Sequence, residues 1–268
     1  MPANPPTNPI DALFVRLRGE GRKAFMPFLT AGDPSVDYLK TILPAAAAAG
    51  ASLMEIGFPY SDPIADGPTI QASYTRALDR GLKVADIFRT LAEVSASPEW
   101  NTPLAGMVSW SLIHRRGPDA FLEACVASGL HGAVVPDLPA DEADDFAARC
   151  RDRDFKLILL VTPTTPMARA ERIVALCSGF LYCVSVVGIT GERDFIPEPL
   201  RDQLARLRNL TDLPLCVGFG VSKPEHVAHL KDIADGVIVG SAIVRHQETG
   251  DTAAIAALIS QLAGALKN

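Results

Sequence analysis

The stretch PLCVGFGVSKPEHVAHLKDIADGVIVGSA, residues 214–242, places one amphipathic segment between two apolar runs. The runs PLCVGFG (214–220) and GVIVGSA (236–242) are almost continuously apolar, as is typical of parallel strands buried on both faces. Pro224 stands early in the segment between them, where a helix tolerates proline best. The stretch therefore predicts a strand–helix–strand unit of a parallel sheet.

The same unit repeats along the whole chain. Six further apolar runs precede it, separated by segments of helical character: AFMPFLT (24–30), SLMEIGF (52–58), PLAGMVSW (103–110), GAVVPD (132–137), KLILLVT (156–162) and FLYCVSV (180–186). Eight strands, each followed by a helix, predict a TIM barrel, (β/α)8, that forms a single α/β domain over residues 1–268. A doubly wound open sheet is the alternative, although no long linker divides the chain.

One more helix is predicted ahead of the first strand. Residues 10–22 have helical spacing, with Leu13, Phe14 and Leu17 on one face. Residues 1–7 are rich in proline, so we expect a loose N-terminal segment before this extra helix.

Composition narrows the class of protein. Of the 268 residues, 48% are hydrophobic, which excludes a disordered chain. The 25 Lys and Arg residues against 31 Asp and Glu give a net charge of −6, with no basic run, which argues against a nucleic-acid partner. The negative net charge does not exclude an anionic ligand, because backbone amides alone can hold a phosphate.

The cysteines and the N-terminus indicate the compartment. Five cysteines, an odd number without CxxC spacing, argue against a disulfide framework and against a zinc site, so we expect no metal. No basic region followed by an apolar run, the pattern of a secretory signal, stands at the N-terminus. Every apolar run is shorter than the roughly 18 residues that a membrane helix needs. We expect a cytoplasmic protein with no membrane association.

In either fold the reactive residues are expected at the carboxyl ends of the strands. The second run contains an acid, Glu55, and continues into GFPYSDPIADGPT (57–69), which holds Asp62 and Asp66. An unpaired carboxylate is costly to bury, so burial at a barrel mouth would raise the pKa of Glu55 and suit it to proton transfer near neutral pH. The alternative is a structural Glu55 paired with a neighbouring strand.

Small residues end the last two runs. Gly218 and Gly220 end the seventh, and Gly240 and Ser241 end the eighth. They would let backbone amides approach an anion at the place where barrels often bind phosphate. The glycines could instead serve turn geometry only.

The sixth run also leads into a candidate site element. Tyr182 lies within this run, and the loop GITGERDF (188–195) follows it. Because glycines flank Thr190, this loop could move over a site as a lid, or it could be an ordinary connection.

Six segments stand out along the chain: FMPFLTAGDP (25–34), MEIGFPYSDPIADGPTIQ (54–71), VPDLP (135–139), GITG (188–191), VGFGVS (217–222) and GSAIV (240–244). In their order and at matching spacing, they resemble the tryptophan synthase alpha subunit family over about residues 10–267. The SDPIADGP block is highly specific, whereas the glycine-rich blocks alone would suit other phosphate-binding barrels.

The resemblance implies a TIM-barrel lyase of L-tryptophan biosynthesis. Such an enzyme cleaves indole-3-glycerol phosphate to indole and glyceraldehyde 3-phosphate by a retro-aldol reaction, without a cofactor. The implied partner is the pyridoxal-phosphate-dependent beta subunit, which receives indole through a tunnel in an alpha2beta2 tetramer. A free-standing lyase that releases indole without a beta partner is the alternative.

The resemblance also implies roles for individual residues. Glu55 corresponds to the catalytic glutamate, Asp66 to the carboxylate that stabilises the indole nitrogen, Tyr182 to the active-site tyrosine, and Thr190 to the lid threonine that orders Asp66. The residues implied in substrate binding are Phe28, Ile70, Met107 and Val134 for the indole, and Gly191, Gly220, Gly240 and Ser241 for the glycerol phosphate, to which the strand-end argument adds Gly218.

Two further segments concern the partner. The resemblance implies that Pro59 and Asp62, in the loop after the second run, contact the beta subunit. At Ser109-Trp110-Ser111-Leu112 the chain departs from the aromatic-rich run ending in Asn-Pro that the family has near its indole pocket. We therefore expect an altered pocket rim here, with the catalytic pair intact.

Overall fold

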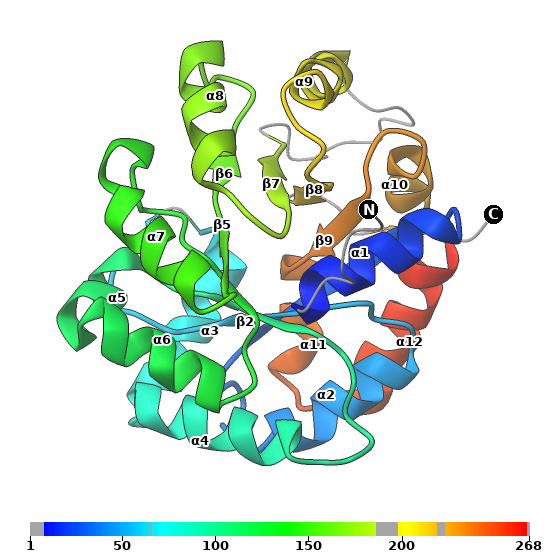
Figure 1. Cartoon of the computed structure of the whole chain (residues 1–268). Coiled ribbons are helices and arrows are strands. Elements are labelled where there is room, and N and C mark those ends of the chain that lie inside the picture. The colour runs from blue at the N-terminus through cyan, green and yellow to red at the C-terminus, as the bar shows by residue number, and fades with distance from the viewer. Residues whose placement is uncertain (1–7, 65, 186–197, 219–222, 267–268) are drawn as a thin grey trace.

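The computed structural model describes residues 8–64, 66–185, 198–218 and 223–266 (Figure 1). Within these ranges nine strands form one sheet, and every pair of neighbouring strands is parallel. The strands are β1 (Ala24–Thr30), β2 (Met54–Gly57), β3 (Leu104–Met107), β4 (Gly132–Val134), β5 (Lys156–Ile158), β6 (Leu160–Val161), β7 (Leu181–Val184), β8 (Leu215–Gly218) and β9 (Gly236–Val239).

The sheet closes into a barrel through one bent strand. The strand order is β5-β4-β3-β2-β1-β9-β8-β7-β6, so the two end strands follow each other in the chain across the single residue Leu159. The amide of Leu159 donates to Cys177 Sγ at 3.4 Å instead of to a strand, which splits the predicted fifth run in two. The closed order confirms the (β/α)8 barrel and excludes the doubly wound open sheet.

Helices surround the barrel (Figure 1). They are α1 (Pro9–Gly19), α2 (Leu39–Ala48), α3 (Pro68–Asp79), α4 (Val84–Ser95), α5 (Trp110–Arg116), α6 (Pro118–Ala127), α7 (Asp144–Asp152), α8 (Met167–Leu176), α9 (Glu198–Arg208), α10 (Pro224–Leu230), α11 (Ser241–Gln247) and α12 (Thr252–Gly264), with a 3-10 turn at Ala140–Glu142. The predicted third run, 103–110, is too long, because β3 ends at Met107. Ser109 is instead the N-cap of α5 and Trp110 its first residue.

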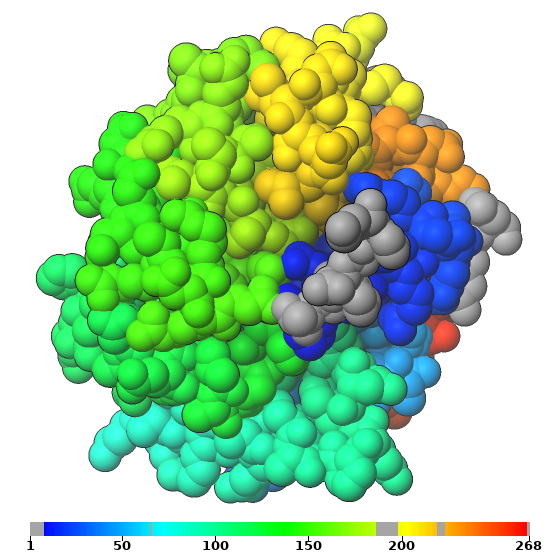
Figure 2. Space-filling model, viewed as in Figure 1, coloured from blue at the N-terminus to red at the C-terminus, as the bar shows by residue number. Residues whose placement is uncertain are grey.

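Helix α1 covers the amino end of the barrel, and in the space-filling view it lies on the surface among the surrounding helices (Figure 2). Leu13, Phe14 and Leu17 are buried, as the spacing predicted, and the Phe14 ring lies 5.8 Å from that of Phe180. The helix ends at Gly19, short of the predicted residue 22, because the chain turns at Gly21 with φ of +64°.

A buried ion pair anchors α3 to the end of β1. Asp33 is fully buried, and Arg76 of α3 grips its carboxylate with two bonds, Nη2–Oδ2 at 2.6 Å and Nε–Oδ1 at 3.1 Å. Arg80 Nη1 adds a third contact at 3.2 Å. A buried carboxylate is tolerated only where such partners satisfy it.

Arg76→Met is expected to lower the free energy of unfolding by about 2 kcal/mol, less than the roughly 3–5 kcal/mol of a fully buried pair, because Arg80 remains. Urea denaturation measures the loss. The matched control is Arg89→Met, which breaks an exposed pair with Asp86 and should cost below about 0.5 kcal/mol. Equal losses in the two variants would show that the Asp33 pair contributes no more than a surface pair.

Candidate active site

Strand β2 places Glu55 inside the barrel, in register with Phe28 of β1 and Ala105 of β3. The residue is 2% exposed, and no described residue gives Oε1 a hydrogen bond. The pKa of Glu55 is raised to about 8, mainly by burial and to a lesser extent by the nearby Asp66 carboxylate. Glu55 forms no ion pair with any described residue. The alternative that Glu55 is a structural residue paired with a neighbouring strand is therefore not supported. A carboxylic acid that keeps its proton at neutral pH can donate it to a bound molecule.

Asp66 lies in the loop between β2 and α3, close enough to Glu55 for their charges to interact. Its amide donates to the carbonyl of Pro63 at 3.1 Å. Burial raises the pKa of Asp66 to about 6. Near neutral pH the site therefore holds a neutral acid, Glu55, beside an ionised one, Asp66.

Tyr182 of β7 lies in the same interior space. It is 3% exposed, and burial, followed by Glu55 and Asp66, raises the pKa of its phenol well above the ordinary value. Gly218 at the end of β8 faces this ring, so a Cβ there would overlap the Tyr182 hydroxyl and ring. The absence of a side chain at Gly218 thus makes room for Tyr182, a role that the strand-end argument had not foreseen.

The four residues predicted to bind indole come together. Phe28, Ile70, Met107 and Val134 are each at most 7% exposed and belong to one apolar cluster inside the barrel that also includes Tyr182. Gly57 admits this packing, because a Cβ on it would overlap the Phe28 ring. The cluster forms an apolar wall next to the two acids.

The predicted phosphate residues are described in part. β9 ends at Val239, Gly240 is the N-cap of α11, and Ser241 begins that helix. A Cβ on Gly240 would lie 3.7 Å from Phe28 Cβ and 3.8 Å from Ile70 Cδ1, in ordinary contact distance, so Gly240 faces the apolar wall. The first amides of a helix have no partner within it. Thr190, Gly191 and Gly220 lie outside the described residues.

The sequence did not reveal two tyrosines of the site. Tyr74 of α3 is 1% exposed, and its ring lies 5.9 Å from that of Tyr60. Burial and then Asp66 raise the pKa of both phenols, that of Tyr60 to about 12. Helical spacing could have found Tyr74, because it stands four residues after Ile70 and so shares its face.

The sequence analysis did not identify Asp137, although it follows β4 at the carboxyl end of a strand, where reactive residues are expected. Its Oδ2 accepts from Ser109 Oγ at 2.6 Å, and its Oδ1 accepts from the amide of Trp110 at 2.7 Å. Ser109 Oγ also lies 2.7 Å from Ser111 Oγ. The segment that departs from the family pattern thus forms a polar cluster at the start of α5.

The two residues predicted at a partner interface differ in exposure. Asp62 is exposed, and its Oδ2 accepts from Ser61 Oγ at 2.8 Å, whereas Pro59 is buried in this chain. Ile64, two residues beyond Asp62, is 92% exposed, an unusual state for a large apolar side chain.

A cavity of about 560 Å³ opens beside Asp66. Asp66 and Met107 line it together with Asp137, Thr162 and Arg169. Because Met107 also belongs to the apolar wall, the wall adjoins a cavity lined by residues that follow β4 and by residues of α8.

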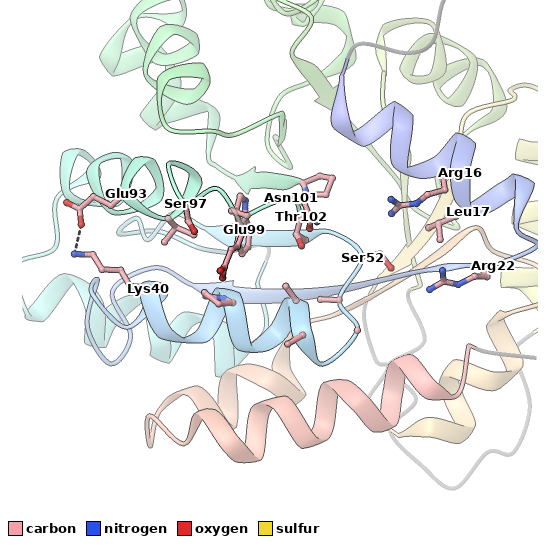
Figure 3. Close-up of a pocket in the computed structure, with 18 residues that line it drawn as sticks. Arg16, Leu17, Arg22, Lys40, Ser52, Glu93, Ser97, Glu99, Asn101 and Thr102 are labelled. Carbon is pink, nitrogen blue, oxygen red and sulfur yellow. Dashed lines mark ion pairs between the residues drawn. The ribbon is translucent and has the colours of Figure 1, made fainter.

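A larger groove of about 820 Å³ lies at the opposite end of the barrel. Figure 3 shows Arg16 and Arg22 near one end of it and an ion pair near the other, in which Lys40 Nζ lies 2.5 Å from Glu93 Oε2. Its lining residues Ser52 and Thr102 precede β2 and β3, so the groove is at the amino ends of the strands. Reactive residues of barrels lie at the carboxyl ends, so the groove is not the candidate active site.

In the part of the chain that the structure describes, no helix has the length and apolar character to cross a membrane. Nor do three His, Cys, Asp or Glu side chains among those residues group closely enough to hold a metal ion.

Comparison with known proteins identifies the family. A family model described as tryptophan synthase alpha chain matches residues 14–267. A relative of that name from Rhodopirellula baltica is 51% identical over 238 residues, covering 88% of this chain and 86% of the relative. One from Rippkaea orientalis is 44% identical over 259 residues, covering 95% and 96%.

Solved structures agree with this match. The tryptophan synthase subunit alpha of Legionella pneumophila has a TM-score of 0.89 at 31% identity and covers 97% of this chain and 98% of its own. A tryptophan synthase structure from Mycobacterium tuberculosis has a TM-score of 0.89 at 32% identity, with 97% and 98% covered. The chain therefore belongs to the family that its motifs predicted, the tryptophan synthase alpha chain family, lyases that cleave indole-3-glycerol phosphate to indole and glyceraldehyde 3-phosphate.

Proposed function

We propose that Glu55, Asp66 and Tyr182 perform this cleavage. The observation that supports it is a pair of interacting acids, buried Glu55 and half-buried Asp66, whose pKa values differ, about 8 for Glu55 and about 6 for Asp66. Two acids with separated pKa values in one pocket suit a reaction that needs both a proton donor and a fixed negative charge.

In the proposed sequence, protonated Glu55 first gives its proton to C3 of the indole ring. The ring nitrogen then becomes positive, and ionised Asp66 stabilises that charge. The Glu55 carboxylate next takes the proton of the hydroxyl on the adjacent glycerol carbon. That carbon becomes the aldehyde, the bond to C3 breaks, and its electron pair restores the aromatic ring. Glu55 ends protonated, so no cofactor or metal takes part.

The remaining residues would bind the substrate. Phe28, Ile70, Met107 and Val134 form the apolar wall that suits the indole ring, and the proposed catalytic residue Tyr182 belongs to the same cluster. We assign the glycerol phosphate to the first amides of α11 at Gly240 and Ser241, with Gly191 and Gly220 completing the site and Gly218 shaping it. We assign Thr190 to ordering Asp66. The phosphate is remote from the bond that breaks, so its binding energy serves orientation.

The partner we propose is a tryptophan synthase beta subunit, in an alpha2beta2 tetramer that receives the indole. Exposed Asp62 and Ile64, in the loop that also holds Asp66, support a docking surface, and buried Pro59 would act by shaping that loop. The five free cysteines suit the reducing cytoplasm in which we place the enzyme, as one domain over residues 1–268.

Adding a purified beta subunit is expected to raise the rate of indole release, because docking on the loop would also set the geometry of Asp66. Asp62→Ala should reduce this activation more than it reduces the rate of the isolated chain, and raised salt should weaken it further. Steady-state assays of both proteins, with and without the beta subunit, measure the difference.

The matched control is Asp79→Ala, an exposed acid at the other end of α3, which should leave the activation unchanged. A high intrinsic rate with no response to the beta subunit would instead support the free-standing lyase.

A further inference from the structure

Gln71, in the first turn of α3, bonds the loop from which Asp66 projects. Its Nε2 donates to the carbonyl of Asp66 at 2.8 Å and to the carbonyl of Pro63 at 3.1 Å. A carboxamide nitrogen has two hydrogens, so both are used on this one loop. We propose that Gln71 is a positioning residue that fixes the peptide of Asp66 and thereby the place of its carboxylate in the active site, an inference that rests on the proposed role of Asp66.

The loop has few hydrogen bonds of its own. Pro59, Pro63 and Pro68 have no N–H to donate, and among the described residues 59–66 the backbone–backbone bonds are those from the amide of Ile64 to the carbonyl of Asp62 and from the amide of Asp66 to the carbonyl of Pro63. Gln71 therefore supplies two of the bonds on which the loop conformation depends. One of them is to the carbonyl of Asp66 itself, so it restrains the backbone from which the carboxylate extends.

Helix α3, which carries Gln71, is fixed to the barrel by two buried contacts. Two residues later in α3, Ser73 is fully buried, and its Oγ lies 2.7 Å from Thr30 Oγ1 of β1. One turn beyond Gln71, Arg76 forms the bidentate pair with buried Asp33. Because α3 is fixed to the barrel at both points, its first turn can hold the loop in one place.

Gln71→Met keeps the length of the side chain and removes both donors. We expect kcat for indole release to fall by about 10- to 100-fold, since a misplacement of about 1 Å can cost 10² in rate, while KM changes less than about twofold. The control is Thr75→Val on the same helix, which loses only the bond of an exposed hydroxyl to the carbonyl of Gln71 and should keep the wild-type kcat. A wild-type kcat in Gln71→Met would overturn the inference.

The acid limb of the pH profile adds a readout that a purely structural role would not move. Burial raises the pKa of Asp66, so a loosened loop that admits water should lower it. In Gln71→Met the acid limb of kcat is therefore expected to move to lower pH. An unmoved limb together with a reduced kcat would show that Gln71 acts through something other than Asp66.

A double-mutant cycle locates the effect. If Gln71 acts through Asp66, adding Gln71→Met to Asp66→Asn should lower kcat by less than about twofold more, whereas independent effects would multiply. Multiplied losses contradict the inference. An Asp66→Asn enzyme with wild-type kcat contradicts the proposed role of Asp66 instead, so the two failures are distinguishable.

Gln71→Glu keeps the assay decisive if Gln71→Met does not fold. It preserves the shape and the helix preference but directs an ionised carboxylate at two carbonyl oxygens. We expect a loss of kcat at neutral pH at least as large as that given for Gln71→Met, and a wild-type kcat would again overturn the inference.

Discussion

Replacing Glu55 by Gln is expected to lower kcat for indole release by about 10²–10⁴, the usual contribution of a general acid–base group. The amide keeps the shape of the side chain but cannot donate a proton to C3 or accept one from the hydroxyl. The apolar wall and the α11 amides remain, so the affinity for glycerol phosphate should stay within about twofold. Steady-state assays and titration calorimetry measure the two quantities.

The matched control for this prediction is Glu123→Gln, an exposed acid of α6, which should keep the wild-type rate. The folded state provides a second check. The pKa of Glu55 is raised from about 4.5 to about 8, so wild-type stability falls as pH rises between these values, and Gln removes that loss. Glu55→Gln should therefore be the more stable protein at pH 9. Near wild-type turnover would show that Glu55 is structural.

The wild-type pH profile follows from the same two acids. Asp66 must be ionised, so kcat/KM should fall as pH drops through about 6, and Glu55 must be protonated, so it should fall again as pH rises through about 8. In Glu55→Gln the residual activity should lack the upper limb.

Asp66→Asn is expected to lower kcat by about 10²–10³, the usual effect of removing a group that stabilises charge in the transition state. The indole nitrogen is positive only after C3 is protonated, so the loss should fall on kcat more than on KM. The Asp66 charge also raises the pKa of Glu55, so the upper limb of the pH profile should move to lower pH in this variant.

The control for this second prediction lies in the same loop. Asp62→Asn removes an exposed carboxylate and should leave the rate of the isolated chain unchanged. An effect of Asp66→Asn on KM alone would mean that Asp66 positions the ground state.

Much of the barrel was predictable from the sequence, because strands buried on both faces must be apolar along their whole length. Each of the eight runs contains a strand. The errors lie where apolar character continues past the strand. Trp110 extends the third run, yet Ser109 caps a helix there, and the first amide of that helix donates to Asp137, 27 residues away, a contact that local pattern does not encode. The bend at Leu159 likewise depends on Cys177, which lies 18 residues later.

The candidate acids of the site could be identified from the sequence, because a carboxyl group within or just after a buried strand is costly unless it is used. The sequence also indicated the family, through the SDPIADGP block. How these residues meet became clear from the folded chain: Glu55 has no ion pair among the described residues, Gly218 makes room for Tyr182, and Gln71 donates to the Asp66 carbonyl. Such relations depend on distances between separate elements, which exist only once the barrel has closed and its interior has packed.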